Sequence, residues 1–471
     1  NFEYDVRGLL TSFYPGEEIV LRPGRIQGDK EPDKTLAVEY LDGRICVTFR
    51  KADSEKQADA PVDYSDRKDT KSVLKRLVYG LLSEDTGKTL PWGTLTGIRP
   101  TKIPMAMLEE GRSDEEIIRY MEETYLASRE KIDLSIEIAK REKEILKEID
   151  YRDGYSLYIG IPFCPTTCLY CSFTSYPVSK WSARMDEYLD ALFQEIDYTK
   201  EAFRGKKLNT VYIGGGTPTT LEPDHLDRLL AKVEESFDLQ DMKEWTVEAG
   251  RPDSVTREKL RALKRHPVTR ISINPQTMKA ETLKFIGRRH TPEQIEEAYA
   301  MAREEGFDNI NMDLILGLPE ETPDDVRRTM EKLTEMAPDS ITVHSLAVKR
   351  AARLNTMKEQ YAHLKFENTE EMMNLTADYC RRLGLVPYYL YRQKNMAGNF
   401  ENVGYAKPGR AGIYNILIME EKQSIMALGA GSTTKAVFPD GRIERCDNVK
   451  DIDQYLGRIQ EMIDRKRKLL S

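Results

Sequence analysis

The spacing of apolar residues differs along the chain, and the first segment has the spacing of strands. Short β-branched runs are separated by Pro-Gly and Asp-Gly pairs, which mark turns. These runs lie at residues 18–21, 36–40 and 45–49. The polar residues 51–69 follow, and we expect them to be exposed. The pattern predicts a small β-rich module at the start of the chain.

Helical spacing replaces strand spacing in the next segment. Residues 71–82 and 113–150 carry apolar positions three and four apart among many charges, which predicts amphipathic helices. Between them, residues 90–104 are rich in Gly, Pro and Thr and include Trp92 and Arg99. We interpret this stretch as a connector, with a binding loop as the alternative.

From Tyr155 the chain alternates short apolar strands with charged amphipathic helices, which is typical of βα units around a parallel sheet. The strands are expected at residues 156–161, 210–213, 245–249, 270–273, 309–315 and 340–345. Six units predict a partial (β/α)6 TIM-like barrel, since a complete barrel has eight. Ligands of such a sheet bind at the carboxyl ends of its strands. The residues that follow each strand are therefore the candidates for function.

The alternation ends near residue 351. A long helix is expected at residues 369–383, and a segment rich in Gly and aromatic residues spans 387–414. We interpret the last part of the chain as a separate cap over the barrel. The predicted α/β fold then has four parts: a β-rich N-terminal α+β module at 1–66, a helical connector region at 67–150, the core barrel at 151–350 and a C-terminal α/β cap at 351–471.

Composition narrows the class of protein. The chain has 471 residues and a net charge of -8, so no general basic surface indicates a nucleic-acid or anionic-membrane partner. It contains no apolar run of membrane-spanning length, and its first residues lack the pattern of a secretory signal. We expect a soluble cytoplasmic protein, and a monomer.

Three of the six cysteines fall within eight positions, in the sequence GIPFCPTTCLYCSF that follows the first barrel strand. Cys164, Cys168 and Cys171 have the spacing C-x3-C-x2-C. Thiolates favour zinc or iron-sulfur clusters, but a structural zinc site needs a fourth ligand, and none lies nearby. The motif therefore favours a cluster over zinc. The remaining cysteines are scattered, and we interpret them as buried apolar residues.

Three cysteine ligands leave one iron of a [4Fe-4S] cluster open, and S-adenosylmethionine (SAM) can chelate that iron through its amino and carboxylate groups. Reduction of the cluster then cleaves SAM to a 5′-deoxyadenosyl radical, with the protein positioning the cofactor. An open, exposed cluster also predicts oxygen sensitivity and an anaerobic setting.

Polar residues follow the other strands. The turn IGGGTPTTL lets backbone approach a ligand closely. Glu248 in VEAGRPD is suited to bond a ribose or an ammonium group, with a capping or salt-bridged carboxylate as the alternative. Gln276, Arg288 and Asp313 complete the ring. Asp313 is the least expected of them, because the strand around it is otherwise apolar.

The motifs LYIGIPFCPTTCLYC, YIGGGTPT, VEAGRPD, RISINPQ and NMDLILGLP occur in this order. Together they resemble the radical SAM superfamily, and within it the oxygen-independent coproporphyrinogen III dehydrogenase (oxidase)-like family, most strongly its HemZ branch. The segments YYLYRQKN and NVGYAKPG resemble the same branch. The resemblance implies a radical SAM oxidoreductase of anaerobic porphyrin and haem biosynthesis, which decarboxylates coproporphyrinogen III oxidatively to protoporphyrinogen IX.

The resemblance also implies roles for individual positions. The three cysteines would hold the [4Fe-4S] cluster as its metal ligands. Residues that would contact the SAM on the cluster are Tyr158, Gly215 and Glu248. Residues matching positions that bind a second SAM in the authentic dehydrogenase are Tyr170, Gly216, Thr217, Gln276, Arg288, Asp313 and, in a degenerate motif, Ala347. The implied partners are a tetrapyrrole substrate and an electron donor such as flavodoxin or ferredoxin.

Two departures from the family pattern keep alternatives open. The authentic dehydrogenase has a further cysteine where this chain has Phe173, and its usual Gly-Val is Asn274-Pro275 here. Haem chaperones of the HemW type share the Phe but carry a His-Asn haem-binding motif, where this chain reads GNFENVGY. The alternatives are a chaperone-like haem-binding protein without decarboxylase activity, and a radical enzyme acting on another tetrapyrrole. For substrate carboxylates the cationic candidates are Arg392, Lys394 and Arg410, which could equally be surface charges.

Overall fold

The computed structural model describes residues 2–22, 24, 32–52, 54–347, 349, 352–357, 361, 363–393, 396 and 399–471. The chain forms two compact units. The first comprises Asn1–Lys140 and Tyr391–Glu401, and the second comprises Arg141–Leu390 and Asn402–Ser471. Each unit is described separately below.

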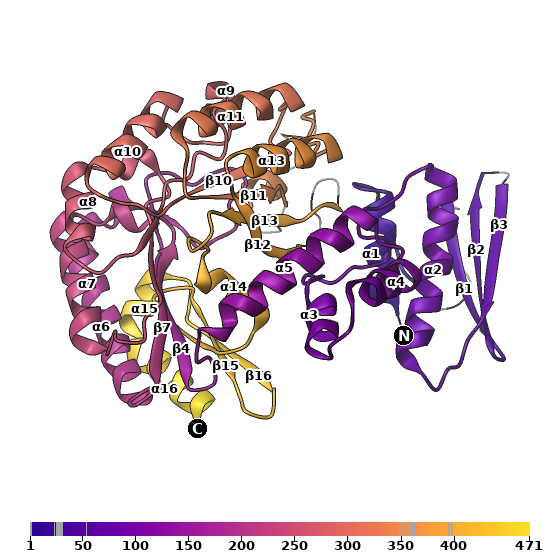
Figure 1. Cartoon of the computed structure of the whole chain (residues 1–471), viewed down its shortest axis with the longest axis horizontal. Coiled ribbons are helices and arrows are strands. Elements are labelled where there is room, and N and C mark those ends of the chain that lie inside the picture. Colours follow the sequence, from indigo (N-terminus) through magenta and orange to yellow (C-terminus); the bar gives the residue numbers. More distant parts are fainter. Residues whose placement is uncertain are drawn as a thin grey trace. The chain divides into compact units, whose positions relative to one another are not determined.

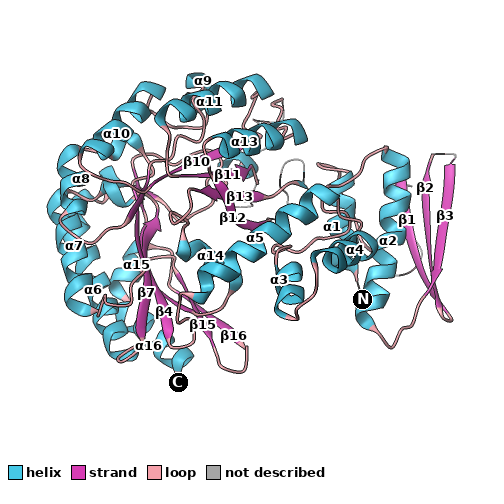
Figure 2. Cartoon of the chain, in the orientation of Figure 1, coloured by secondary structure: helices cyan, strands magenta, loops and turns pink. Residues whose placement is uncertain are grey.

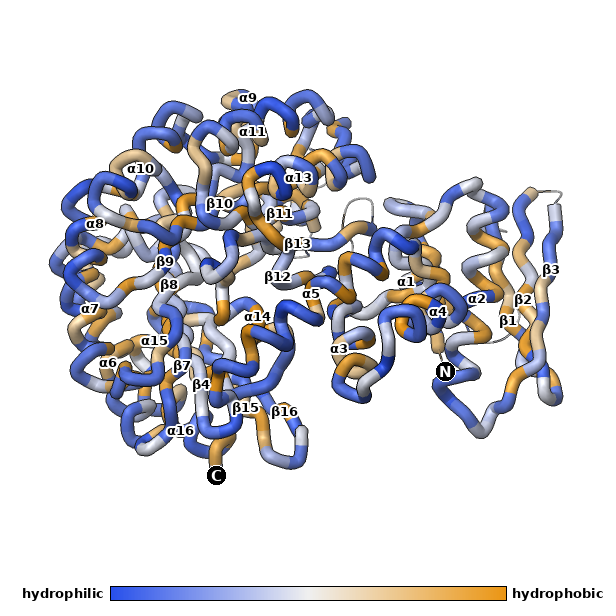
Figure 3. Tube along the Cα trace, viewed as in Figure 1, coloured by the Kyte–Doolittle hydropathy of each residue, from blue (hydrophilic) through white to orange (hydrophobic). Residues whose placement is uncertain are grey.

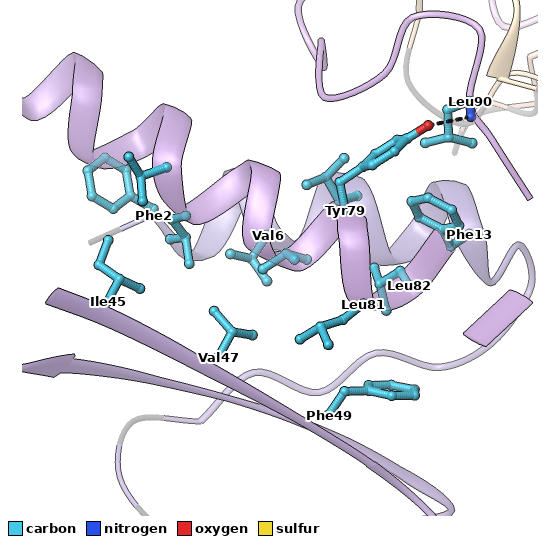
Figure 4. Close-up of a cluster of buried hydrophobic side chains, with 14 residues drawn as sticks. Phe2, Val6, Phe13, Ile45, Val47, Phe49, Tyr79, Leu81, Leu82 and Leu90 are labelled. Carbon is cyan, nitrogen blue, oxygen red and sulfur yellow. Dashed lines mark hydrogen bonds between the residues drawn. The ribbon is translucent and has the colours of Figure 1, made fainter. Parts of the chain in front are cut away.

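The first unit begins with two helices on an antiparallel sheet (Figures 1 and 2). The sheet has the order β1 (Lys34–Leu41), β2 (Arg44–Lys51), β3 (Ser54–Pro61). Helices α1 (Glu3–Phe13) and α2 (Arg67–Thr86) pack together. Their shared core, drawn in Figure 4, contains Phe2, Val6, Leu9, Phe13, Ile45, Val47, Phe49 and the apolar face of α2.

One local prediction for this unit is wrong, and two of its elements were not predicted. Residues 18–21 form no strand, and α1 precedes them. The apolar stripe of α1 is short, because its buried residues are only Val6, Leu9 and Phe13. Strand β3 comes from the polar stretch expected to be exposed, and its residues are exposed or half-buried. It is an edge strand that turns small residues toward the core and polar ones toward water, so its sequence lacks a strong apolar signal.

The rest of this unit is helical, as predicted. Its helices are α3 (Lys102–Glu109), α4 (Asp114–Tyr125) and α5 (Arg129–Lys147), which continues into the second unit. Ser113 caps α4 in a capping box, and Leu126 in the left-handed conformation ends it. The predicted connector at 90–104 contains the fully buried Trp92, whose indole N–H donates to Glu401 Oε2 at 2.7 Å.

The second unit is built on an eleven-stranded sheet with the order β12-β13-β11-β10-β9-β8-β7-β4-β14-β15-β16. The six central strands are parallel and match the six predicted from the sequence. They are β4 (Gly154–Ile161), β7 (Lys207–Gly215), β8 (Glu244–Glu248), β9 (Arg270–Ser272), β10 (Ile310–Leu316) and β11 (Ser340–Ser345). The α/β barrel-type fold is therefore confirmed.

Helices follow the parallel strands and lie along the outer side of the sheet (Figure 1). They are α6 (Met185–Ala202), α7 (Pro223–Ser236), α8 (Arg257–Lys264), α9 (Ala280–Phe285), α10 (Pro292–Glu304) and α11 (Pro323–Met336). Threonine side chains cap α8, α10 and α11 at their N-termini. These caps start each helix directly after its loop, which leaves the strand ends free for the motifs.

The residues after 350 extend both edges of the same sheet. Strands β12 (Val386–Tyr391) and β13 (Asn402–Ala406) join beyond β11, and β13 runs antiparallel to it. Strand β14 (Ser424–Leu428) joins β4 in parallel, followed by β15 (Thr433–Val437) and β16 (Ile443–Asp447). The helices of this region are α12 (Arg353–Thr356), α13 (Glu370–Arg382), α14 (Ile413–Glu420), α15 (Ile452–Gly457) and α16 (Ile459–Leu470).

Hydropathy follows this architecture. Apolar residues concentrate along the central strands and on the inward sides of the helices, and polar residues cover the outer helix surfaces (Figure 3). Within the described part of the chain, none of the helices has the length and apolar character required to cross a membrane.

Candidate active site

The three clustered cysteines lie on the loop after β4. This loop forms a short parallel pair between β5 (Phe163–Cys164) and β6 (Tyr176–Pro177). Two hydrogen bonds tie it to the segment after α9: Leu169 N–H donates to Ile286 O at 2.9 Å, and Thr166 Oγ1 donates to Gly287 O at 2.8 Å. The loop that carries the thiols is therefore held by backbone on two sides.

The thiols lie close enough to influence one another. Burial raises the pKa of the Cys164 thiol to about 11, and the charges of Cys168 and Cys171 raise it further. The hydroxyl of Thr217 opposes this by donating to Cys164 Sγ at 3.5 Å. Iron binding replaces the thiol proton, so three neighbouring thiols at one strand end suit a metal cluster.

The glycine-rich turn after β7 lies against the start of the cysteine loop. Gly216 N–H donates to Ile161 O at 2.8 Å, and Thr217 N–H donates to Phe163 O at 2.7 Å. A Cβ atom on Gly216 would meet the carbonyl oxygens of Phe163 and Ile161 at 2.6 and 2.8 Å. Gly215 has a φ of +104°. Only glycine allows this close approach and this backbone conformation.

Glu248 ends β8 beside the glycine-rich turn. Burial raises its pKa to about 7, although the hydroxyl of Tyr212 donates a hydrogen bond to Oε1 and lowers it. The Tyr212 ring stacks on Tyr414 with centroids 4.5 Å apart, and on Tyr158 at 6.2 Å. Glu248 is thus a carboxylate in an aromatic surrounding, where an ammonium or ribose hydroxyl would find few competing polar groups.

Asp313 and Gln276 face each other across β9 and β10. Gln276 N–H donates to Asp313 O at 2.9 Å, and Gln276 has a φ of +68°, which is rare for a residue with a side chain. Burial acts to raise the pKa of Asp313, but His344 and Asn311 outweigh it and lower that pKa. His344 Nε2 lies 3.8 Å from Asp313 Oδ2. A residue in this rare backbone conformation beside an acidic side chain on a central strand is more typical of a functional site than of a core.

Arg288 and Tyr170 join the same region. Arg288 is buried, and it donates to Asn274 O at 2.6 Å and to the Tyr170 hydroxyl at 3.5 Å. Ala347 follows β11 and is half-buried. The predicted residues thus come from the carboxyl ends of the six parallel strands and from the loops that follow them.

Residues outside the predicted set also border the site. Tyr212 bonds Glu248, and Arg251 lies 3.7 Å from Cys168 Sγ. Tyr212 is the first residue of the motif YIGGGTPT, but it looks like an ordinary strand residue in the sequence. Arg251 is part of VEAGRPD, but an arginine in a loop gives no signal by itself that it is buried. Phe173 is 67% exposed, with Lys349 Nζ 5.5 Å from its ring centroid.

The three cationic candidates for substrate carboxylates have other surroundings. Arg392 is buried in the first unit, where its guanidinium donates to Leu95 O and to Asn399 Oδ1. Arg410 pairs with Asp308 at 2.9 Å. Lys394 lies outside the described residues. Asp308 precedes β10, so Arg410 is paired near the amino end of that strand.

The described residues contain no group of three His, Cys, Asp or Glu side chains arranged around one metal ion. A cubane has a different requirement, because each thiolate binds a different iron. Three loop cysteines, a glycine-rich turn packed closely against their loop and the half-buried carboxylate of Glu248 fit a [4Fe-4S] cluster with SAM beside it.

Comparison with known proteins decides the family. The Radical SAM superfamily profile matches residues 158–333. The oxygen-independent coproporphyrinogen-III oxidase-like protein HemZ of Bacillus subtilis is 42% identical over 409 residues, which are 86% of this chain and 81% of that protein. The chain belongs to this radical SAM family. It is accordingly a radical SAM oxidoreductase, and its cofactors are a [4Fe-4S] cluster and SAM.

Two further relatives mark the range of this radical SAM family. The haem chaperone HemW of Bacillus subtilis is 32% identical over 311 residues, which are 65% of this chain and 76% of that protein. The structure of coproporphyrinogen III oxidase (HemN) from Escherichia coli aligns with a TM-score of 0.53 and 23% identity, covering 68% of this chain and 73% of that chain. The second likeness supports the fold.

Proposed function

We propose that this radical SAM enzyme decarboxylates coproporphyrinogen III oxidatively to protoporphyrinogen IX. The observation that carries the proposal is the convergence of the cysteine loop, the glycine-rich turn and Glu248 at the ends of β4, β7 and β8. Likeness to HemZ along most of the chain favours a tetrapyrrole as the substrate. A radical enzyme that acts on another tetrapyrrole, one of the alternatives given above, would use the same site and differ only in its product.

In this proposal Cys164, Cys168 and Cys171 hold the cluster. When bound and reduced, the cluster and SAM supply the 5′-deoxyadenosyl radical that removes hydrogen from the propionate β-carbon. Gly215 gives backbone access to SAM, and Glu248 accepts hydrogen bonds from its ammonium or ribose group. The electron donor is proposed to be a flavodoxin or ferredoxin.

The second group of residues is proposed to hold another SAM molecule. Tyr170 and Arg288 form one side, and Gln276 and Asp313 form the other. The buried Oε1 atom of Gln276 has no hydrogen-bond partner among the described residues. A buried amide oxygen without a partner costs free energy, and a ligand donor would remove that cost.

The second candidate function is to bind haem without catalysing a reaction, because the haem chaperone HemW is also a relative. The segment in which chaperones carry their His-Asn motif contains Glu401 here. Its carboxylate accepts from Trp92 and pairs with Lys131 at 2.9 Å, and both side chains are nearly fully buried. This segment is engaged in a structural ion pair, which favours the enzyme over the carrier.

An anaerobic assay tests the proposal. Reconstituted, reduced protein is incubated with SAM and coproporphyrinogen III, and 5′-deoxyadenosine, carbon dioxide and tetrapyrroles are measured by mass spectrometry. We expect protoporphyrinogen IX together with 5′-deoxyadenosine. Formation of 5′-deoxyadenosine without decarboxylation would refute this substrate while retaining the radical chemistry. Haem binding with neither product would support the carrier.

A further inference from the structure

Arg251 contacts the cysteine loop directly, although no motif or relative assigns it a role. It follows β8 and is 3% exposed. Its Nη1 atom lies 3.7 Å from Cys168 Sγ and 3.0 Å from Thr166 Oγ1. A buried guanidinium therefore donates both to a cysteine sulfur and to the loop that carries it.

The guanidinium is fixed from behind by Asp253. Arg251 Nε and Nη2 donate to the two carboxylate oxygens at 2.9 and 2.7 Å, which is a bidentate pair. His290 Nδ1 lies 3.8 Å from the same carboxylate. The Ser254 hydroxyl donates to Arg251 O at 2.7 Å. The Arg251 head group is consequently held in one orientation, with Nη1 aimed at the loop.

A second guanidinium approaches the same cysteine. Burial acts to lower the pKa of Arg288, but Tyr170 and Cys168 outweigh it and raise that pKa above the usual range. The resemblance already gives Arg288 a contact with SAM, and Arg288 also donates to Tyr170 and to Asn274 O. Arg251 has no such second task, since its remaining donors all go to Asp253 and Thr166.

We propose that Arg251 is a positioning residue that raises the reduction potential of the [4Fe-4S] cluster through its contact with Cys168. This inference depends on the proposed assignment of Cys168 as a cluster ligand. Reduction adds one negative charge to the cluster. A fixed cation and an N–H donor at a ligand sulfur stabilise the reduced state more than the oxidised state.

The contact has a consequence for the supply of electrons. Arg251 makes the cluster easier for a donor of given potential to reduce, and it does so without occupying the open iron. Low dielectric in the buried site strengthens the effect, because solvent does not screen the guanidinium. Removal of the charge is expected to lower the potential while the three thiols remain available.

The test is an EPR-monitored redox titration of anaerobically reconstituted full-length protein, with iron and sulfide content measured in parallel. Arg251→Gln removes the charge, and Arg251→Lys retains it. Arg251→Gln combined with Asp253→Asn also avoids leaving a buried carboxylate unpaired. Arg257→Gln is the matched control, because Arg257 begins α8 and pairs with Glu304 and Glu305 instead of the loop.

We expect the ratio of reduced to oxidised cluster in Arg251→Gln to fall about tenfold at the wild-type midpoint, which is about 59 mV for one electron. Arg251→Lys should restore part of the shift, and Arg257→Gln should show none. An unchanged midpoint in Arg251→Gln would overturn the proposal. Where that variant loses iron, an unchanged midpoint in the double variant would overturn it equally.

A different result is expected if Cys168 is not a ligand of the cluster. Cys168→Ala is expected to lose the cluster, measured as iron content and as the EPR signal of the reduced protein. If Cys168→Ala retained wild-type iron and signal, Cys168 would not be a ligand, and the proposed site would be wrong before Arg251 is considered.

Discussion

Tyr212 donates a hydrogen bond to the Glu248 carboxylate across the neighbouring strands β7 and β8. Burial raises the pKa of this carboxyl to about 7, and without the bond that pKa would be higher still. At neutral pH the bond therefore favours the ionised carboxylate, which is the form that can bind an ammonium group. Tyr212, the first residue of the motif YIGGGTPT, thus influences the charge of Glu248.

The first prediction concerns this bond. Tyr212→Phe retains the ring and its stacking on Tyr414 but removes the hydroxyl. A hydrogen bond to a charged group contributes about 1.5 to 3 kcal/mol, so we expect SAM to bind about tenfold more weakly or worse. Anaerobic equilibrium dialysis with labelled SAM measures the change.

Tyr155→Phe is the matched control for that prediction. Tyr155 lies on β4, is 2% exposed and packs on Phe203, with a centroid distance of 4.4 Å. Tyr155→Phe also removes the hydroxyl of a buried tyrosine on a strand, but this tyrosine lies away from Glu248. Equal SAM affinity in the wild type and Tyr212→Phe would contradict a role for the hydroxyl.

The second prediction concerns the pH dependence of stability. The folded-state pKa of Glu248, about 7, lies above the ordinary value of 4.5. Between these values the folded chain holds a proton that the unfolded chain has lost, so stability falls as pH rises through this window. Glu248→Gln cannot ionise. We expect it to remove part of this fall, on the order of 2 kcal/mol.

Urea unfolding of the cluster-free protein at pH 5 and pH 8 measures this difference. The Gln variant should gain stability relative to wild type at pH 8 and gain little at pH 5. Asp313→Asn should lower stability about equally at both pH values, because the lowered pKa of Asp313 lies below 3.8 and its contribution is lost only as pH falls below that value. A Glu248→Gln variant with the wild-type pH profile would show that Glu248 does not titrate in this range.

The third prediction concerns the close approach of Gly216 to the cysteine loop. In Gly216→Ala the new methyl group would meet Phe163 O at 2.6 Å and Ile161 O at 2.8 Å. Overpacking of this kind costs about 1 to 3 kcal/mol. We expect lower iron content after reconstitution and a lower melting temperature, measured by iron assay and calorimetry.

Gly457→Ala provides the control for Gly216→Ala. Gly457 ends α15, is exposed, and has no atom within 4 Å of an added Cβ. The substitution should leave iron content unchanged and stability equal or slightly higher, because alanine favours helix. Full iron loading in Gly216→Ala would mean that the loop can move away from the glycine turn at little cost.

Sequence alone predicted the parallel part of the sheet well. Each of the first five strands is a short apolar run followed by an amphipathic helix, and both signals are local. Strand β14 could not be recognised in the same way. It joins β4 although Ile425 lies 269 positions after its partner Ser156 in the chain, so the pairing depends on long-range contacts that no local pattern records.

The features of the site also divide into those that the sequence shows and those that depend on the folded structure. The spacing of the cysteines and the order of the motifs are visible in the sequence. The contacts of Tyr212 with Glu248 and of Arg251 with Cys168 depend on the directions of side chains from neighbouring strand ends. A tyrosine in a strand and an arginine in a loop are common, and only folding makes these two members of the site.

The fourth prediction concerns a buried ion pair at the C-terminus of the chain. Glu195 on α6 and Lys466 on α16 are both fully buried, and their charged groups lie 2.5 Å apart. The Glu195 carboxylate also accepts from Gly429 N–H, Asn448 Nδ2 and the Tyr455 hydroxyl. The pair joins α6, the end of β14 and α16 in one network.

Lys466→Met would leave this carboxylate buried without its cation, which costs about 3 to 5 kcal/mol. Combining Glu195→Gln with Lys466→Met removes both charges and should recover most of the loss. Lys468→Met on the exposed side of α16 is the control and should be neutral. Urea unfolding gives the four free energies. If Lys466→Met alone were neutral, the remaining donors to Glu195 would suffice to stabilise its charge, and α16 would be held by apolar packing of Met462 and Ile463 instead.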